Sequence, residues 1–206
     1  QAEAVRVRGA GVYAMPELPE VEAMRCLVER HCMGRRITRV GALETGNGPR
    51  DGKFDGKVIG ESVTEGHLVA ALAGRTVTGA KRRGKHLWLE LSGSGPCLLF
   101  HFGMTGSLAI DGVERFSFQS FSVDEDWPPR FTKLQLELVG GKRLAFADPR
   151  RFGKILLRRQ PTEEPPVSLL APDPLAAPLA FEPFAGGFRS SALAVKALLL
   201  DQERVI

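Results

Sequence analysis

The sequence has few cysteines and no long apolar run, and each shortage excludes a class of protein. Only three of the 206 residues are cysteines, Cys26, Cys32 and Cys97, and they form no C-x-x-C pair. Such an odd, scattered set supports neither a disulfide framework nor a zinc ribbon, so we expect no bound metal and no other cofactor. The apolar run over 192–200 is interrupted by Lys196 and falls short of the ~20 residues that cross a bilayer, so we expect no membrane partner.

The chain also lacks a strong excess of charge of either sign. Its formal net charge is +4, its pI is about 9.2, and 43% of its residues are hydrophobic. That hydrophobic share is ordinary for a globular protein, and the length suffices for one fair-sized domain or two small ones. A mildly basic chain suits a polyanionic partner, but charge alone does not identify one.

One amphipathic helix is expected near the start of the chain, over about residues 19–33. Its apolar positions recur at helical spacing, whereas charged residues occupy most positions between them. Pro19 in the first turn and Gly34 after the last turn are typical start and stop signals. The apolar positions are Val21, Met24, Val28 and Cys32.

After this helix the pattern changes to short strands separated by turns. Leucines alternate with other residues over 87–91 and again over 134–138, as in strands with one face in a core. We therefore predict a mainly β fold of the α+β class, in which the helix accompanies a two-layer antiparallel β-sandwich of about eight strands. The predicted strands are Arg36–Val40, Thr76–Ala80, Leu87–Leu91, Cys97–Phe102, Ser107–Ile110, Leu134–Leu138, Arg143–Ala147 and Ile155–Arg158.

Both ends of the chain differ from this β-rich part. Seven of the fourteen prolines fall within 160–183, which predicts a linker over 160–189 with little regular structure in its proline-rich part. A short helical tail is expected over 190–200, and Gly186-Gly187 disfavours a longer helix before it. Residues 1–14 precede a candidate initiator, Met15, and are interpreted as an N-terminal extension: a precursor or transit-peptide remnant, or a gene model begun too early.

The run Met15-Pro16-Glu17-Leu18-Pro19-Glu20 is the most informative motif. A proline directly after an initiator methionine gains a free secondary amine when that methionine is removed. Such an amine can attack a sugar aldehyde carbon and form an iminium, as a lysine does in a Schiff base. Glu17 places a carboxyl group beside this nucleophile. By itself, however, the run is explained equally well by two prolines that shape the entry to a helix.

Four further motifs follow in order, and the whole set resembles the formamidopyrimidine-DNA glycosylase family, also called Fpg/Nei or MutM. The resemblance covers about residues 15–202 and implies a catalytic β-sandwich domain over 15–159. It also implies that 190–206 begins a helix-two-turn-helix region, which this chain leaves truncated together with the family's zinc or zincless finger. The motifs are Arg82-Arg83-Gly84-Lys85, H-F-G-M-T-G-S-L over 101–108, D-P-R-R-F-G over 148–153 and V-K-A-L-L-L-D-Q over 195–202.

The resemblance assigns Pro16 as the nucleophile and Glu17 as its acid/base partner. Glu17 would protonate the opening sugar ring, for which we expect a carboxyl group whose pKa is raised by burial. Lys85 resembles the family's active-site lysine, which contacts the phosphate beside the lesion and assists proton transfer. The plainer interpretation of Arg82-Arg83 is a solvated basic turn.

Met104, Arg150 and Phe152 resemble the family's wedge. When a damaged nucleotide leaves the duplex, unstacking leaves a hole that apolar side chains and a guanidinium can fill. Core packing for Met104 and Phe152, and a surface ion pair for Arg150, are the plain alternatives. His101 resembles a phosphate contact, with a structural histidine as the alternative.

We interpret the chain as a bifunctional DNA glycosylase and abasic-site lyase of base excision repair, which removes oxidised purines such as formamidopyrimidines and 8-oxoguanine. We expect a monomer that binds damaged double-stranded DNA in the nucleus, with an organelle as the alternative. Because a Met15–Pro16 peptide bond makes the proline nitrogen an amide, we expect the working protein to begin at Pro16. The other interpretations are a truncated, non-catalytic damaged-DNA-binding module and an inert fragment.

Overall fold

The computed structural model describes residues 16–60, 63–113, 127–171, 173 and 180–199. The N-terminal extension, Met15, residues 114–126 and the Asp201-Gln202 pair lie outside the described residues. Two four-stranded antiparallel sheets form the body of the chain, and the predicted fold class is confirmed. One sheet has the order β1 (Ile37–Gly41), β6 (Thr132–Leu138), β7 (Arg143–Ala147) and β5 (Ser107–Ile110), and the other β2 (Val77–Arg83), β3 (His86–Leu91), β4 (Cys97–His101) and β8 (Lys154–Arg158).

The core lies between the two sheets. The predicted leucine rows of β3 and β6 face it, and Leu87, Leu89 and Leu134 are at most 1% exposed. The Phe146 ring of β7 joins the layers, because it lies 5.5 Å from the Phe100 ring of β4 and 5.9 Å from the Phe102 ring. The strand alternation visible in the sequence therefore sets which faces are buried.

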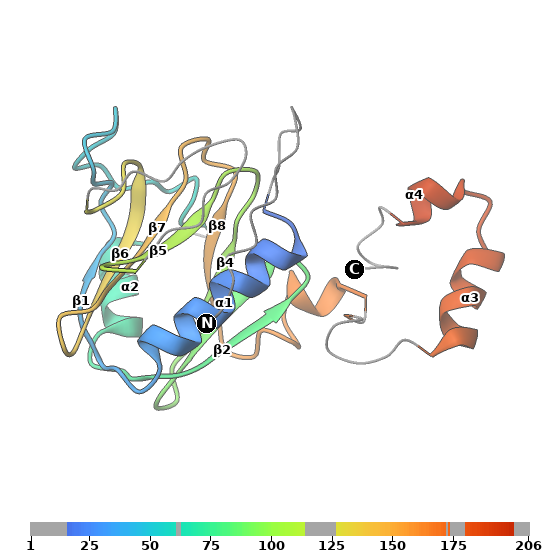
Figure 1. Cartoon of the computed structure of the whole chain (residues 1–206), viewed down its shortest axis with the longest axis horizontal. Helices are drawn as coiled ribbons and strands as arrows, with labels where there is room; N and C mark the ends of the chain where they lie inside the picture. The colour runs from blue at the N-terminus through green and yellow to red at the C-terminus, as the bar shows by residue number, and fades with distance from the viewer. Residues whose placement is uncertain (1–15, 61–62, 114–126, 172, 174–179, 200–206) are drawn as a thin grey trace.

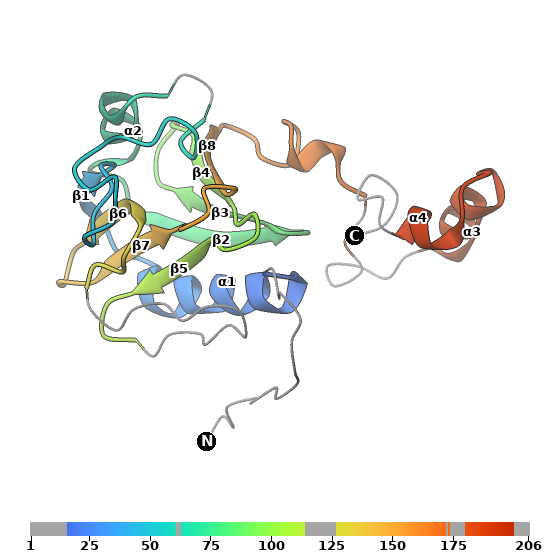
Figure 2. The ribbon, with the colours of Figure 1, turned by 90° about the horizontal axis from the view of Figure 1, so that it is seen from above.

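Helix α1 (Leu18–Cys32) matches the predicted helix almost to the residue. Its apolar stripe is fully buried, and it packs mainly against the edge strands β2 and β5. Burying a side chain such as Met24 contributes about 1.5–3 kcal/mol. Figures 1 and 2 show this helix running along the sandwich, with its first turn toward the end of the domain where β2 turns into β3.

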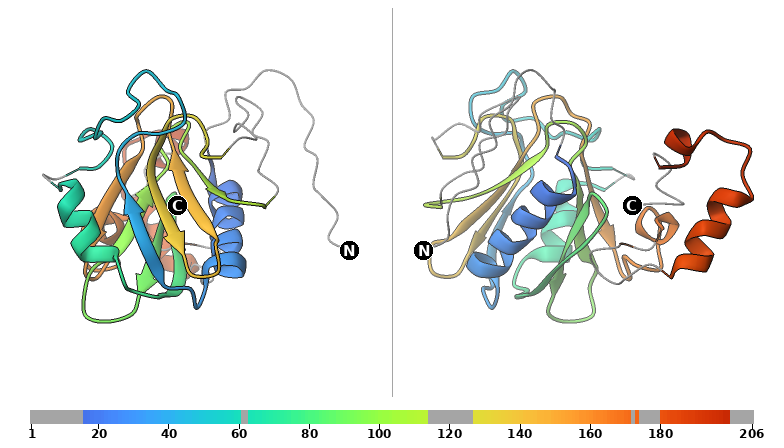
Figure 3. Two further views of the ribbon diagram at one scale, coloured as in Figure 1. Left: turned by 90° about the vertical axis from the view of Figure 1, so that its left-hand side faces the viewer. Right: turned by 45° about the vertical axis from the view of Figure 1, so that its right-hand side comes forward.

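Two further helices differ from the sequence predictions. Helix α2 (Glu65–Leu72) was not predicted; Thr64 caps it by accepting a hydrogen bond from the His67 backbone at 3.2 Å, and it lies across the strands from α1 (Figure 3). Helix α3 (Phe181–Arg189) spans Gly186-Gly187, where a helix was disfavoured. It stands with α4 (Val195–Leu199) to one side of the sandwich in Figure 1, beyond the short 3-10 helix Val167–Leu169.

Among the described residues, no helix is both long and apolar enough to cross a membrane.

Candidate functional site

Glu17 and Lys85 form an ion pair beside Pro16. Lys85 Nζ lies 2.6 Å from Glu17 Oε2, and Pro16 is buried. The expectation that Glu17 is buried is wrong, because its side chain is 51% exposed: it stands before the first turn of α1 and extends to solvent and to Lys85. The structure thus places the three predicted catalytic residues together, although 68 positions separate Glu17 from Lys85 in the sequence.

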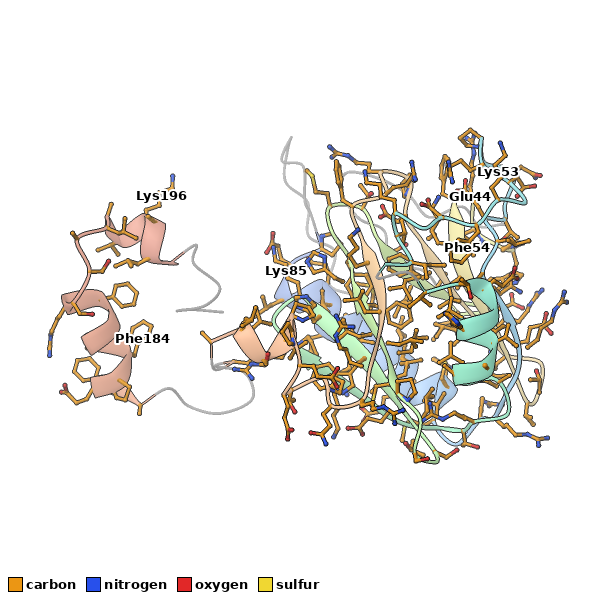
Figure 4. The ribbon with its side chains drawn as sticks, turned by 180° about the vertical axis from the view of Figure 1, so that it is seen from behind. Glu44, Lys53, Phe54, Lys85, Phe184 and Lys196 are labelled. Atoms are coloured by element: carbon orange, nitrogen blue, oxygen red, sulfur yellow. The ribbon has the colours of Figure 1, made fainter. Side chains whose placement is uncertain are left out.

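A tight hairpin holds Lys85 in this position. Only Gly84 and Lys85 separate β2 from β3, and Arg83 pairs with His86 across the turn. Gly84 has a φ of 54°, the positive value that two-residue hairpin turns require and that glycine adopts without strain. Figure 4 shows Lys85 at the end of the sandwich nearest the C-terminal helices.

The arginine before this turn is not solvated, contrary to the plain interpretation of the basic run. The Arg82 side chain is only 4% exposed, and its guanidinium lies 2.9 Å from a Glu22 carboxylate oxygen and 2.7 Å from one of Asp173. Arg83 donates to the backbone oxygens of Leu170 and Ala171. The hairpin is therefore anchored on α1 and on the segment that follows the sandwich.

The predicted wedge residues lie on two loops that share hydrogen bonds. Asp148, which is fully buried, accepts from the Thr105 hydroxyl at 2.7 Å and from the backbone N–H groups of Arg150 and Gly153 at 3.2 and 2.7 Å. Thr105 follows Met104 on the loop between β4 and β5, whereas the other two belong to the loop between β7 and β8. One carboxylate thus fixes both loops that carry the wedge.

The side chains of the predicted wedge are at least partly exposed. Phe152 is 46% exposed, which is unusual for a phenylalanine, and the exposed Arg150 guanidinium lies 5.1 Å from the centre of its ring. Met104 is half-buried. The core-packing alternative for Phe152 is therefore excluded, and no salt bridge of Arg150 occurs among the described residues.

The His101 ring packs against the ring of a second histidine, tilted by 33° to it. The His86 and His101 rings lie 4.7 Å apart on the outer face of the β2-β3-β4-β8 sheet, where they line a cavity of about 470 Å³ with Lys154 and Arg158. Burial, and then the neighbouring His101, lower the pKa of His86 to about 3, and burial followed by the Lys85 charge lowers the pKa of His101. Both rings are neutral near pH 7, so His101 offers a hydrogen bond and no full charge to a phosphate.

A buried charge cluster beside the wedge was missed by sequence reasoning. Lys133, at the bulge between Thr132 and Leu134, is 1% exposed and pairs with Glu44 and Asp55, which are equally buried. Arg151 binds Asp55 through two hydrogen bonds, of 2.6 and 2.8 Å. Glu44 and Asp55 belong to a charged, glycine-rich loop whose composition is typical of a solvated segment, so the sequence carries no signal for this cluster. Within the described ranges, no group of three His, Cys, Asp or Glu side chains could hold a metal ion.

Comparisons with known proteins agree with the predicted resemblance. The model of the formamidopyrimidine-DNA glycosylase N-terminal domain matches residues 15–155. The chain is 39% identical over 190 residues to a formamidopyrimidine-DNA glycosylase of Arabidopsis thaliana, covering 91% of this chain and 46% of that protein. It is 36% identical over 195 residues to one of Nocardioides sp., covering 93% of this chain and 59% of that protein.

Solved structures give the same result. The crystal structure of the MutM (Fpg) protein from Thermus thermophilus aligns with a TM-score of 0.64 and 31% identity, covering 92% of this chain and 59% of that one. A complex of Lactococcus lactis Fpg with DNA containing an abasic site aligns with a TM-score of 0.68 and 26% identity, covering 92% of this chain and 62% of the Lactococcus lactis chain. The chain thus spans about half to three fifths of the length of the relatives it matches. On the matched domain and its fold, the chain belongs to the formamidopyrimidine-DNA glycosylase family.

Proposed function

We propose that the chain is the catalytic part of a DNA glycosylase of base excision repair that removes oxidised purines and then nicks the strand. The Glu17–Lys85 ion pair supports this proposal, because its carboxyl group belongs to the residue directly after Pro16, the candidate nucleophile, and its ammonium group lies 2.6 Å from that carboxylate. Damaged double-stranded DNA is the proposed partner, bound by a monomer, with Met104, Arg150 and Phe152 as the wedge and His101 on a phosphate. The nucleus is the proposed compartment, with an organelle as the alternative.

In the proposed reaction, the Pro16 nitrogen attacks C1′ of the damaged nucleotide. The bond from C1′ to the base breaks, and the base leaves with the electron pair and takes up a proton. Glu17 protonates O4′ as the sugar ring opens, which leaves a cationic iminium between Pro16 and C1′. Loss of a C2′ proton then breaks the C3′–O bond, and water finally releases Pro16 from the sugar.

Borohydride trapping tests this proposal on a chain that begins at Pro16. Reduction of the iminium on DNA with an abasic site should give a covalent adduct that denaturing electrophoresis detects. The same chain with residues 1–15 attached is the matched control, because its Pro16 nitrogen is an amide, and it should give no adduct. No adduct from the shortened chain refutes the lyase.

The Met15–Pro16 bond present in the sequence motivates a second candidate, a non-catalytic module that binds damaged DNA. Such a module prefers an abasic-site duplex to an undamaged one but leaves both strands intact. Parallel binding and nicking assays on the same duplex separate the two functions: selective binding without nicking or trapping, with either N-terminus, favours the module.

A further inference from the structure

The pair formed by Asp55 and Arg151 lies directly beneath the exposed wedge loop. Arg151 stands between Arg150 and Phe152, the two wedge residues of the loop between β7 and β8. Its Nε and Nη2 donate to the two carboxylate oxygens of Asp55 at 2.6 and 2.8 Å. This two-point geometry fixes a guanidinium in direction as well as in distance.

Asp55 is itself held from several sides. It is 1% exposed, Lys133 Nζ lies 3.3 Å from Oδ2, and the Lys57 backbone N–H donates to Oδ1 at 3.2 Å. The Arg151 hydrogen bonds and the Lys133 charge outweigh burial and hold the pKa of Asp55 well below its usual range. The carboxylate is therefore a fixed, charged anchor for Arg151.

The backbone of Arg151 shows that the loop needs such an anchor. Its φ is 59°, a left-handed conformation that costs a residue with a side chain about 1–2 kcal/mol. In this conformation the side chain of Arg151 reaches the buried carboxylate, while Arg150 and Phe152 on either side remain exposed. Lys57, two residues after Asp55, places its ammonium 5.2 Å from the centre of the Phe152 ring.

We propose that Asp55 and Arg151 are positioning residues for the wedge: their ion pair fixes Arg150 and Phe152 in the geometry that enters the duplex. The pair acts through the loop, not through the reacting groups, since the adjoining Glu44 and the catalytic Lys85 lie well apart in Figure 4. The inference rests on the proposed function. It adds a positioning role for Arg151, which lies within the D-P-R-R-F-G motif, and a buried anchor, Asp55, which lies outside the motifs.

Fluorescence of 2-aminopurine placed beside a tetrahydrofuran abasic analogue tests the inference. Entry of the wedge changes the stacking of this base, and the analogue cannot form an iminium, so the whole chain can be used. Asp55→Asn keeps the shape of the side chain and removes its charge, whereas Arg151→Gly removes the guanidinium and tolerates the positive φ. We expect both variants to lose at least about tenfold in lesion-specific entry, because small errors of position are costly in such sites.

Two controls separate positioning from folding. Arg151→Gly should still unfold in one cooperative transition well above the assay temperature, whether or not Asp55→Asn does, although loss of a partner of the buried Asp55 lowers its melting temperature. Arg151→Lys should give an intermediate wedge-entry signal because it retains one contact. Asp111→Asn is the matched control: it breaks another arginine pair, in which Arg143 donates twice to Asp111 at 2.9 and 2.6 Å, beyond the opposite end of β5. It should leave wedge entry unchanged.

Two outcomes would overturn the inference and leave the proposed function unaffected. Wild-type entry in folded Arg151→Gly refutes it. Weaker binding to undamaged duplex in Arg151→Gly, with Asp55→Asn unaffected, would make Arg151 a direct phosphate contact instead. Borohydride trapping by the unmodified chain starting at Pro16 reports separately on the proposed function.

Discussion

At the residue scale, the acid role proposed for Glu17 can be separated from its role in the fold. In a chain that starts at Pro16, Glu17→Gln should lower base excision by about 10²–10⁴, the usual range for loss of a general acid, and should preserve binding to an abasic-analogue duplex. Single-turnover excision and fluorescence anisotropy measure the two effects. Glu29→Gln is the control, because Glu29 lies on the same helix and, among the residues that the structure describes, pairs with the Arg25 guanidinium alone, at 2.9 Å. Normal excision by Glu17→Gln would remove Glu17 from the mechanism.

His86 makes the stability of the fold depend on pH below its ordinary pKa. The pKa of His86 is about 3 in the folded chain, below the ordinary 6.5. As the pH falls through 6.5, His86 therefore binds a proton in the unfolded chain but stays neutral in the folded chain. Stability is therefore complete above pH 6.5 and declines toward pH 3, by up to about 1.4 kcal/mol per pH unit. His86→Phe should shrink the loss between pH 7.5 and 5.5 by about 1 kcal/mol in urea unfolding. An unchanged loss contradicts the assignment to His86.

Single residues also show what the sequence could and could not predict. Pro16, Glu17 and Lys85 are recognisable as motif residues, and the structure brings them together. The exposure of Glu17 was not predictable, because it depends on where the β2–β3 turn ends relative to α1. The burial of Asp55 was not predictable either. A buried carboxylate in a charged loop differs from a solvated one only through its partners, and the partners of Asp55, Lys133 and Arg151, are about 80 and 95 positions away in the sequence.

At the scale of elements, the close contact of the two wedge loops depends on Gly103. Its φ is 56°, and a Cβ there would lie 2.5 Å from the backbone carbon of Phe152. Gly103→Ala should therefore cost more than the about 1–2 kcal/mol of a left-handed alanine, and should impair wedge entry. Gly93→Ala is the matched control, because Gly93 has a φ of 81° with no atom within 4 Å of the added Cβ. Equal losses of thermal stability in the two variants would mean that the β4–β5 and β7–β8 loops are not in close contact at Gly103.

The elements themselves were largely predictable where one periodicity dominates. Strand β7 was predicted at its observed bounds, Arg143–Ala147, because turn residues bracket it and its apolar residues fit a strand. Helix α2 was missed, since its run of apolar residues over 68–73 has no clear helical period and only its Thr64 cap marks it. Helix α3 forms despite Gly186-Gly187; the Phe184 and Phe188 rings, one turn apart, lie 4.9 Å from each other and support it locally.

At the scale of the whole molecule, Arg82 connects three parts of the chain that are far apart in the sequence: α1, the β2–β3 hairpin and the segment that includes Asp173. Its guanidinium binds Glu22 on α1 and Asp173 beyond the sandwich, and it lies three residues before Lys85. The segment around Asp173 was predicted as a linker with little regular structure, and in the part described up to Asp173 only the turn over 167–169 is helical. Side chains rather than backbone ladders therefore hold this segment against the hairpin.

This arrangement predicts that one buried carboxylate controls docking of the linker. Asp173→Asn leaves Glu22 as the remaining carboxylate partner of the buried Arg82 among the described residues. Loss of one partner from a buried pair typically costs about 3–5 kcal/mol. Amide hydrogen exchange should accelerate first over 167–173 and over the hairpin that carries Lys85, before the strands of the core respond. Glu182→Gln breaks a pair of the same type on α3, with Arg189 at 3.7 Å, but both side chains are more than two-thirds exposed, so it should cost less than about 1 kcal/mol. Equal effects of the two substitutions on exchange would show that Arg82 does not couple the linker to the site.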